Sequence, residues 1–288
     1  MAYERDLQPG RNALTVAGRH LLVVYDAEHG TAEAYDGTCP HRGYLLGVGG
    51  TLRGDRIVCP FHGQVIGLGS GSGCALAVAR HPTLLAGGLL FVRTGDADAG
   101  FAQRIAALDA NHYIVPGFCR RIAAPAELVI ENAFDGAHFQ PVHGIGNAPA
   151  METAQAAGGP YVGTARFALP PSAWHGDAPV AAPFRASAFS PTLVVTELGG
   201  PHPYIMLTAT VPIDARLCEV RLSVMVPADE DGREPDAGKL RYLLRQAEAG
   251  VDKDALIWEN LADPGAIVHA LPFDGPVLGF RDFCAGFR

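Results

Sequence analysis

Short apolar runs separated by glycine-rich turns fill residues 11 to about 100. Residues 21–25 and 89–92 are two such runs, and residues 69–73 form one of the glycine-rich segments. Short apolar stretches bounded by turn-forming residues predict β-strands. We therefore expect a small all-β domain over residues 1–104.

The pattern changes from about residue 125. A helical segment comes first, a Gly/Pro/Ala-rich stretch follows over 144–183, and alternating apolar runs occupy about 192–226. Alternation of this kind predicts strands that have one buried face. Residues 105–288 are therefore expected to form a second domain of α+β class.

The strongest helical pattern lies at 239–262. Its apolar residues recur at steps of three and four and predict one buried helix face: Leu240, Leu244, Ala247, Val251, Trp258 and Leu261. Asp254 falls on that face, where a carboxylate is costly to bury unless it is paired or bound to a metal. Asp254 is a candidate ligand, although a buried ion pair or a shifted register near Gly250 explains its position equally well.

Composition limits the classes of function that the chain can have. The 288 residues are 48% hydrophobic and 18% charged, which is typical of a folded globular protein. The net charge of −8 argues against nucleic-acid binding, because phosphates require a basic surface. No apolar run reaches the roughly 20 residues that cross a bilayer, and the N-terminal residues lack a signal peptide's apolar stretch. We expect a cytoplasmic protein with a small-molecule substrate and no transmembrane segment.

Two Cys/His pairs stand out in the first domain. Cys39 precedes His41 by two positions and Cys59 precedes His62 by three, with a proline after each cysteine. A [2Fe-2S] cluster that has two thiolates on one iron and two imidazoles on the other needs such pairs. A structural zinc site usually groups its two cysteines and then its two histidines. Core cysteines beside solvated histidines explain the paired spacing less well still.

A second candidate site lies at residues 131–143. Asp135 and His138 are three residues apart and are expected on one helix face, while His143 lies just beyond Pro141, where the helix should bend or stop. Two histidines near a helix end can bind one metal, and a distant carboxylate would complete a facial triad with open positions for dioxygen. A pair of surface histidines is the alternative, which the cluster motif in the same chain disfavours.

Together the patterns C-x-H-x17-C-x2-H and D-x2-H-x4-H resemble the α subunits of Rieske non-haem iron oxygenases. Residues 130–139, 254–259 and 274–281 look most like the 3-ketosteroid 9α-hydroxylase and cholesterol 7-desaturase branch. The resemblance implies a Rieske domain over 1–104 and a helix-grip catalytic domain over 105–288, with an antiparallel sheet and flanking helices.

The same resemblance implies the ligand sets. Cys39, His41, Cys59 and His62 would hold the cluster, and His138, His143 and Asp254 would hold a mononuclear Fe(II). Asp135 matches the acid that joins a cluster histidine of one subunit to an iron-binding histidine of the next. The implied assembly is a head-to-tail ring, usually a homotrimer.

The implied function is that of a terminal oxygenase component acting as a monooxygenase. It would use O2, with electrons from NAD(P)H through a ferredoxin or flavin-dependent reductase, to hydroxylate, desaturate or demethylate a hydrophobic, steroid-like or polycyclic molecule. The glycine-rich residues 67–73 lack the strand-to-helix context of a nucleotide site. A tailoring oxygenase acting on a non-steroid natural product, and a Rieske electron-transfer protein with a degenerate second domain, remain alternatives.

Overall fold

The computed structural model describes residues 1–173, 176–228, 235–267 and 270–287, and the chain divides into two compact units, Met1–Asp96 and Ala97–Arg288. The boundary expected between residues 104 and 105 falls inside helix α2 (Phe101–Asp109). The units part before this helix, because α2 packs on strand β12 (His112–Ile122) of the second unit.

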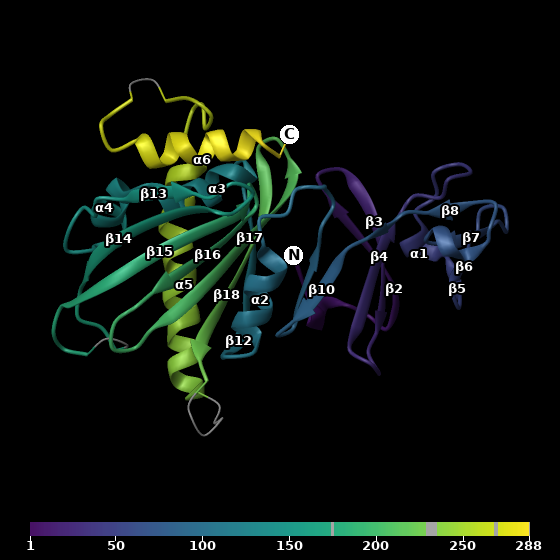
Figure 1. Ribbon diagram of the computed structural model, residues 1–288, viewed down its shortest axis with the longest axis horizontal. Coiled ribbons are helices and arrows are strands. Elements are labelled where there is room, and N and C mark those ends of the chain that lie inside the picture. Colours follow the sequence, from purple (N-terminus) through teal and green to yellow (C-terminus); the bar gives the residue numbers. More distant parts are fainter. Residues whose placement is uncertain (174–175, 229–234, 268–269, 288) are drawn as a thin grey trace. The chain divides into compact units, whose positions relative to one another are not determined.

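The first unit is built from three small sheets and short connecting helices, which confirms the expected all-β architecture (Figure 1). All strand pairs are antiparallel except β7 with β8. The sheets contain β1 (Ala2–Tyr3), β11 (Leu89–Val92) and β10 (Thr83–Ala86); β2 (Gly10–Val16), β3 (Arg19–Asp26), β4 (Thr31–Asp36) and β9 (Arg80–His81); and β5 (Thr51–Arg53), β6 (Arg56–Val58), β7 (Val65–Leu68) and β8 (Ala77–Val78). The short helices are η1 (Glu4–Asp6), α1 (Leu46–Gly49) and η2 (Ser70–Ser72).

The second unit contains one antiparallel sheet of seven strands in the order β12-β18-β17-β16-β15-β14-β13. The remaining strands are β13 (Glu152–Gln155), β14 (Tyr161–Leu169), β15 (Val180–Ser190), β16 (Leu193–Leu198), β17 (Tyr204–Asp214) and β18 (Leu217–Pro227). Its other helices are α3 (Ala126–Glu131), η3 (Asn132–Phe134), η4 (Gly136–His138), α4 (Phe139–His143), α5 (Ala237–Trp258) and α6 (Gly275–Ala285). This is the expected α+β fold.

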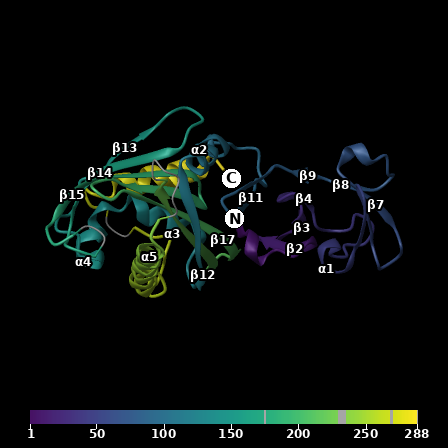
Figure 2. The ribbon, with the colours of Figure 1, turned by 90° about the horizontal axis from the view of Figure 1, so that it is seen from below.

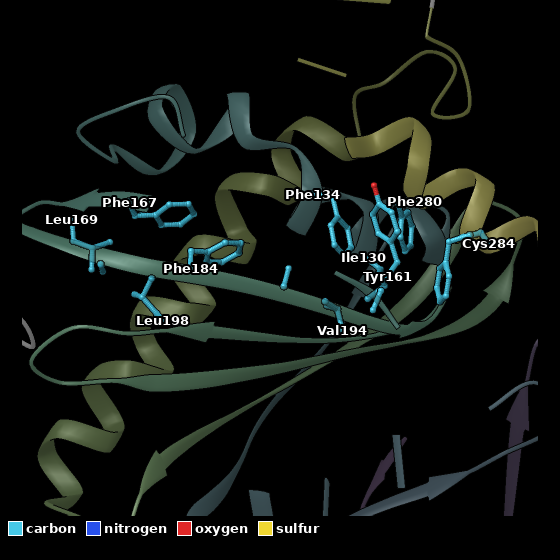
Figure 3. Close-up of a cluster of buried hydrophobic side chains, with 14 residues drawn as sticks. Ile130, Phe134, Tyr161, Phe167, Leu169, Phe184, Val194, Leu198, Phe280 and Cys284 are labelled. Carbon is cyan, nitrogen blue, oxygen red and sulfur yellow. The ribbon is translucent and has the colours of Figure 1, made fainter. Parts of the chain in front are cut away.

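Helices α5 and α6 pack on the same face of this sheet (Figures 1 and 2). Val251 and Trp258 of α5 pack with Val220 and Leu222 of β18. On the neighbouring part of the face, Phe280 of α6 joins a cluster of aromatic side chains from β14, β15 and η3 (Figure 3). We call this covered surface the inner face of the sheet.

Helix α5 differs at both ends from the expected span of 239–262. The side chain of Asp236 accepts a hydrogen bond from the Lys239 N–H (2.8 Å) and caps the helix, which begins at Ala237, two residues before the expected start. The helix ends at Trp258, where the Asn260 side chain donates to the Leu256 carbonyl (2.8 Å). Leu261 therefore lies beyond the helix. Among the described residues, no helix is both long and apolar enough to cross a bilayer.

Candidate metal centres

Two turns of matching geometry carry the Cys/His pairs of the first unit. In each turn the cysteine N–H donates to a carbonyl five residues further on, at 2.8 Å for Cys39 and 2.9 Å for Cys59. The N–H groups of Gly43 and Gly63 donate back to the cysteine carbonyls, both at 2.9 Å. These glycines have φ values of 76° and 67°, which side-chain-bearing residues rarely adopt. The two turns therefore present their side chains in the same way.

The four side chains lie as two pairs. Cys39 and Cys59 are 3% and 1% exposed, while His41 and His62 are exposed, with ring centroids 4.7 Å apart. Burial raises the pKa of the Cys59 thiol, and the adjacent Cys39 thiol raises it further, whereas backbone N–H groups of Phe61 and His62 hydrogen-bond its sulfur and lower it. Adjacent buried thiols that face N–H donors, beside converging imidazoles, fit the donor set of a [2Fe-2S] cluster.

In the second unit, the segment expected to be one helix is broken at Asp135. Asp135 is extended (φ −84°, ψ 90°) between η3 and η4, and its side chain accepts a hydrogen bond from the Ala137 N–H (3.0 Å). The prediction that Asp135 and His138 share a helix face was therefore wrong. An aspartate that caps the following turn competes with helix continuation at its own position.

Of the bend or stop expected at Pro141, the stop does not occur. Pro141 lies in the first turn of α4, where a backbone N–H has no partner within the helix and proline is tolerated. The helix ends instead at His143, and Gly144 follows in the left-handed conformation (φ 71°). His143 is thus the last residue of α4.

His138, His143 and Asp254 come together although α4 and α5 are far apart in sequence. Their candidate ligand atoms all lie within 4.8 Å of one another. The Asp254 Oδ1 atom is 3.0 Å from the Nε2 atom of His143 and 3.9 Å from that of His138. These distances place two imidazole nitrogens and one carboxylate around a common point.

Asp254 is 8% exposed, and its Oδ1 atom is buried without a hydrogen-bond partner in the described part of the chain. Its ionisable neighbours among the described residues are His138 and His143, with no lysine or arginine in an ion pair with it. A buried carboxylate oxygen is costly to leave uncompensated. Two histidines and one carboxylate are the donor set of a non-haem iron site, and a buried carboxylate oxygen that faces two imidazole nitrogens fits such an ion.

His138 is held in the form that can bind a metal. Its Nδ1 atom is 2.5 Å from the Asp135 carbonyl oxygen, so Nδ1 carries the proton and Nε2 is left as the ligand atom. Burial lowers the pKa of His138 and favours the neutral imidazole, against the opposing effect of the Asp254 carboxylate. The Asn132 amide nitrogen lies 3.0 Å from Nε2. Asn132 belongs to the same short segment as His138, but sequence reasoning assigned it no role.

A cavity of about 240 Å³ extends from these three residues between α5 and the inner face of the sheet. Its walls are mainly apolar and include Phe139, Phe167 and Phe184, whose rings pack together (Figure 3 shows the latter two). Tyr204 and Gln246 also line it. Sequence reasoning missed both residues, because their placement depends on which strand faces which turn of α5.

Two family models match separate parts of the chain. Residues 1–82 match the model of the Rieske [2Fe-2S] domain, and residues 101–287 match the model of the 3-ketosteroid 9alpha-hydroxylase C-terminal domain. The second match extends over more than half of the chain.

Curated relatives align over a short segment. A stretch of 62 residues is 45% identical to cholesterol 7-desaturase nvd of Bombyx mori and covers 22% of this chain and 14% of that protein. A stretch of 61 residues is 39% identical to cholesterol 7-desaturase nvd of Hemicentrotus pulcherrimus and covers 21% and 13%. The matches thus span about one seventh of these relatives' length.

Solved structures share the fold over nearly the whole chain. Dicamba monooxygenase bound to 3,6-dichlorosalicylic acid superposes with a TM-score of 0.73 at 18% identity, covering 99% of this chain and 95% of that one. The terminal oxygenase of carbazole 1,9a-dioxygenase from Novosphingobium sp. KA1 gives 0.69 at 16% identity, covering 99% and 91%. NdmA of Pseudomonas putida CBB5, with caffeine, gives 0.69 at 19% identity, covering 96% and 84%.

Proposed function

Because the chain belongs to the Rieske non-haem iron oxygenases, with a C-terminal domain of the 3-ketosteroid 9α-hydroxylase family, we propose that it is a terminal oxygenase component acting as a monooxygenase. One observation carries this proposal. His138, His143 and Asp254 converge at an apolar cavity, in the chain that also carries the two Cys/His turns. A protein that only carries electrons has no need of such a second centre.

In this proposal Cys39, His41, Cys59 and His62 hold a [2Fe-2S] cluster, and His138, His143 and Asp254 hold Fe(II). When bound, the cluster supplies single electrons and the mononuclear iron activates dioxygen at its open positions. The Asp135 carbonyl fixes the His138 tautomer, and the aromatic walls exclude water from the cavity.

We assign the Asp135 carboxylate the role of linking the two kinds of centre between subunits. Its side chain is 35% exposed, and one oxygen accepts from Ala137 while the other lies 3.9 Å from the Nδ1 atom of His138. It is therefore anchored on one side and accessible on the other. A head-to-tail homotrimer, in which a cluster histidine of the neighbouring subunit meets Asp135, is part of the proposal.

The proposed reaction is hydroxylation, desaturation or demethylation of a hydrophobic, steroid-like or polycyclic molecule. The apolar cavity and the likeness to cholesterol 7-desaturases support this substrate class. Electrons would come from NAD(P)H through a ferredoxin or a flavin-dependent reductase, since the sequence predicts no nucleotide site of its own. A cytoplasmic location stays a prediction.

A tailoring oxygenase acting on a non-steroid scaffold is the second candidate. Proteins of similar fold have been solved with caffeine and with 3,6-dichlorosalicylic acid, which are small ring compounds. The low identities of 18–19% show the shared fold alone. A product screen must therefore include both classes of compound.

The test combines metal analysis with product analysis. The purified protein should contain roughly three irons for every two acid-labile sulfides. With a surrogate reductase, NADH and isotopically labelled dioxygen, a panel of steroids and aromatic compounds should yield a product whose mass shows one labelled oxygen, the loss of two hydrogens, or the loss of one methylene unit. A ratio of one iron per sulfide, with no product, would leave an electron-transfer protein.

A further inference from the structure

The C-terminal helix contacts the segment that leads to His138. Helix α6 packs on α3 and on η3, the two short helices that precede this candidate ligand. Arg281 of α6 donates from two guanidinium nitrogens to the two carboxylate oxygens of Glu131, at 2.5 and 2.8 Å. Glu131 is the last residue of α3 and is buried. Because a bidentate contact fixes orientation as well as distance, Arg281 holds the end of α3 in one orientation.

An aromatic contact joins the following turn to the same helix. Phe280 of α6 stacks on Phe134 of η3, with ring centroids 5.2 Å apart and ring planes 17° apart (Figure 3). Both rings are fully buried. Helix α6 is itself anchored to the sheet, because the Tyr161 hydroxyl of β14 donates to the Pro276 carbonyl (2.7 Å). The position of residues 131–134 on the sheet is therefore set through α6.

The residues of this turn orient the His138 ring. The Asp135 carbonyl, directly after η3, lies 2.5 Å from the Nδ1 atom of His138, and the Asn132 amide nitrogen lies 3.0 Å from its Nε2 atom. A shift of residues 131–134 would move both of these groups together. The orientation of the His138 ring therefore depends on where α6 holds the turn.

Arg281 also contacts the chain that continues from the helix of Asp254. Its Nη1 atom donates to the carbonyl of Gly265, which lies in the segment after α5 (3.0 Å). At the end of α5, the Glu259 carboxylate accepts from the N–H of Ala123, shortly before α3 (3.1 Å). The segment that carries His138 and the segment that continues from Asp254 are thus joined at both ends of α3.

We propose that Arg281 is a positioning residue of the candidate metal site. By holding Glu131 and Gly265 together, it sets the spacing between the imidazole of His138 and the carboxylate of Asp254, and with it the affinity of the site for a metal. The inference rests on the proposed function, in that the three candidate ligands bind a metal. Residues that support metal ligands typically change metal affinity by about 10- to 100-fold when they are replaced.

A second ion pair of the same unit separates positioning from stabilisation. A contact that only stabilises the fold lowers the free energy of unfolding and leaves metal binding by the folded molecules unchanged. Arg104 of α2 and Glu197 of β16 form an ion pair at 2.7 Å, with side chains 34% and 31% exposed. Neither residue lines the cavity at the candidate ligands. Glu197→Gln is therefore the matched control for Glu131→Gln.

Metal binding can be measured without turnover, with Co(II) as the probe, because metal analysis distinguishes cobalt from the iron of the cluster. Protein that keeps its [2Fe-2S] cluster is freed of mononuclear iron with a chelator, and its affinity for Co(II) is measured by equilibrium dialysis. Electron paramagnetic resonance of the bound Co(II), recorded with the cluster oxidised and therefore silent, reports the coordination geometry. The variants are Glu131→Gln, Arg281→Lys, Arg281→Gln and the double variant with glutamine at both positions.

We expect Glu131→Gln and Arg281→Gln each to weaken Co(II) binding on the order of tenfold and to alter the resonance spectrum. Arg281→Lys should also weaken binding, since lysine cannot make the bidentate contact. The double variant should bind Co(II) no more weakly than either single variant, because the two residues act as one unit. Glu197→Gln should keep the parent affinity and spectrum.

Each variant is measured below its own unfolding midpoint, as followed by circular dichroism, so that lost affinity belongs to folded molecules. If Arg281→Gln does not fold, Glu131→Gln and Arg281→Lys decide the question. Parent-like affinity and spectrum in these two variants, or equal weakening in the Glu197→Gln control, would overturn the inference while the metal site stands. A parent protein that binds no Co(II) would instead refute the proposed metal site itself.

Discussion

Asp254 is the residue on which the second centre depends. Its Oδ1 atom is buried, lacks a hydrogen bond among the described residues and faces two imidazoles. We expect Asp254→Ala to lose the mononuclear iron and to keep the cluster, because the remaining two histidines form an incomplete site and the Cys/His turns lie in the other unit. Iron and sulfide analysis together with the visible spectrum measure this. Full iron content in the variant would show that Asp254 is not a ligand.

Replacement of Asp135 is expected to have a different outcome. Asparagine keeps an oxygen that can accept from the Ala137 N–H, so Asp135→Asn should retain the fold and both metals. Loss of the negative charge should lower product formation by roughly 10- to 100-fold, as is common when a group supporting a metal ligand is changed. Product analysis beside metal analysis separates the two effects. A variant with normal turnover would contradict the linking role.

His112, at the start of β12, gives a pH prediction. Burial lowers the pKa of His112 below its ordinary value of 6.5 in the folded protein. Between those two values the unfolded chain binds a proton that the folded chain does not, so the stability present above pH 6.5 is lost as the pH falls towards the folded pKa. We expect His112→Phe to lack this part of the pH dependence. Thermal unfolding midpoints of both proteins, measured at about pH 7.5 and pH 5.5, test this prediction. An equal fall of the midpoint in both proteins between these pH values would count against it.

At the scale of elements, an ion pair joins α3 to α6. The Arg281 guanidinium donates to both carboxylate oxygens of Glu131, at 2.5 and 2.8 Å, and also to the Gly265 carbonyl at 3.0 Å. Glu131 is 9% exposed and immediately precedes η3, which leads to Asp135 and His138. The C-terminal helix thus fixes the start of the segment that carries the ligands.

Glu131→Gln should therefore destabilise the second unit by about 1–3 kcal/mol, because a charged bidentate contact is replaced by a weaker one. Arg281→Lys is the matched test of geometry, since lysine keeps the charge but cannot form the two-pronged contact. The free energy of unfolding in urea measures both. If each variant is as stable as the parent protein, the pair contributes nothing to the anchoring of α3.

Element prediction succeeded where periodicity was strong and failed where small side chains hid it. Helix α5 was expected from its apolar stripe, although Leu243 is buried and Leu240 is only partly buried. Strands β13, β14 and the start of β15 lie within the stretch read as Gly/Pro/Ala-rich. Buried positions such as Gly163 and Ala182 carry little apolar volume and weaken the alternation there. Phenylalanines of neighbouring elements fill that space, which no local pattern reveals.

Across the whole molecule, the candidate centres differ in how much of each could be predicted from the sequence. The Cys/His pairs are local and their spacing indicated them, and the presence of that motif in the same chain favoured His138 and His143 as ligands over a pair of surface histidines. Asp254 follows His143 by more than a hundred residues, and the apolar stripe left its role undecided. The fold brings its Oδ1 atom to 3.0 Å from the His143 Nε2 atom, which no local pattern could predict. Tyr204 and Gln246 were not found, because strand register and helix packing decide which polar residues face the cavity.

The proposed ring gives a prediction for the assembly. If Asp135 meets a cluster histidine of a neighbouring subunit, light scattering coupled to size-exclusion chromatography should give about three times the chain mass of 30.3 kDa. The ring should persist in Asp135→Asn if other contacts hold it together. A monomer that still forms product at the normal rate would rule out transfer between subunits.

In the second unit the candidate ligands and most of the cavity wall come from different elements, and this bears on how new substrate ranges can arise. The three candidate ligands stand on α4, its preceding turn and α5, whereas β15, β16 and β17 contribute walls and no ligand. Side chains on those strands can therefore be replaced to change the shape of the cavity for another substrate, while the candidate ligands on the helices stay unchanged. Libraries that vary the strand positions should stay competent for iron uptake, and laboratory evolution can begin there.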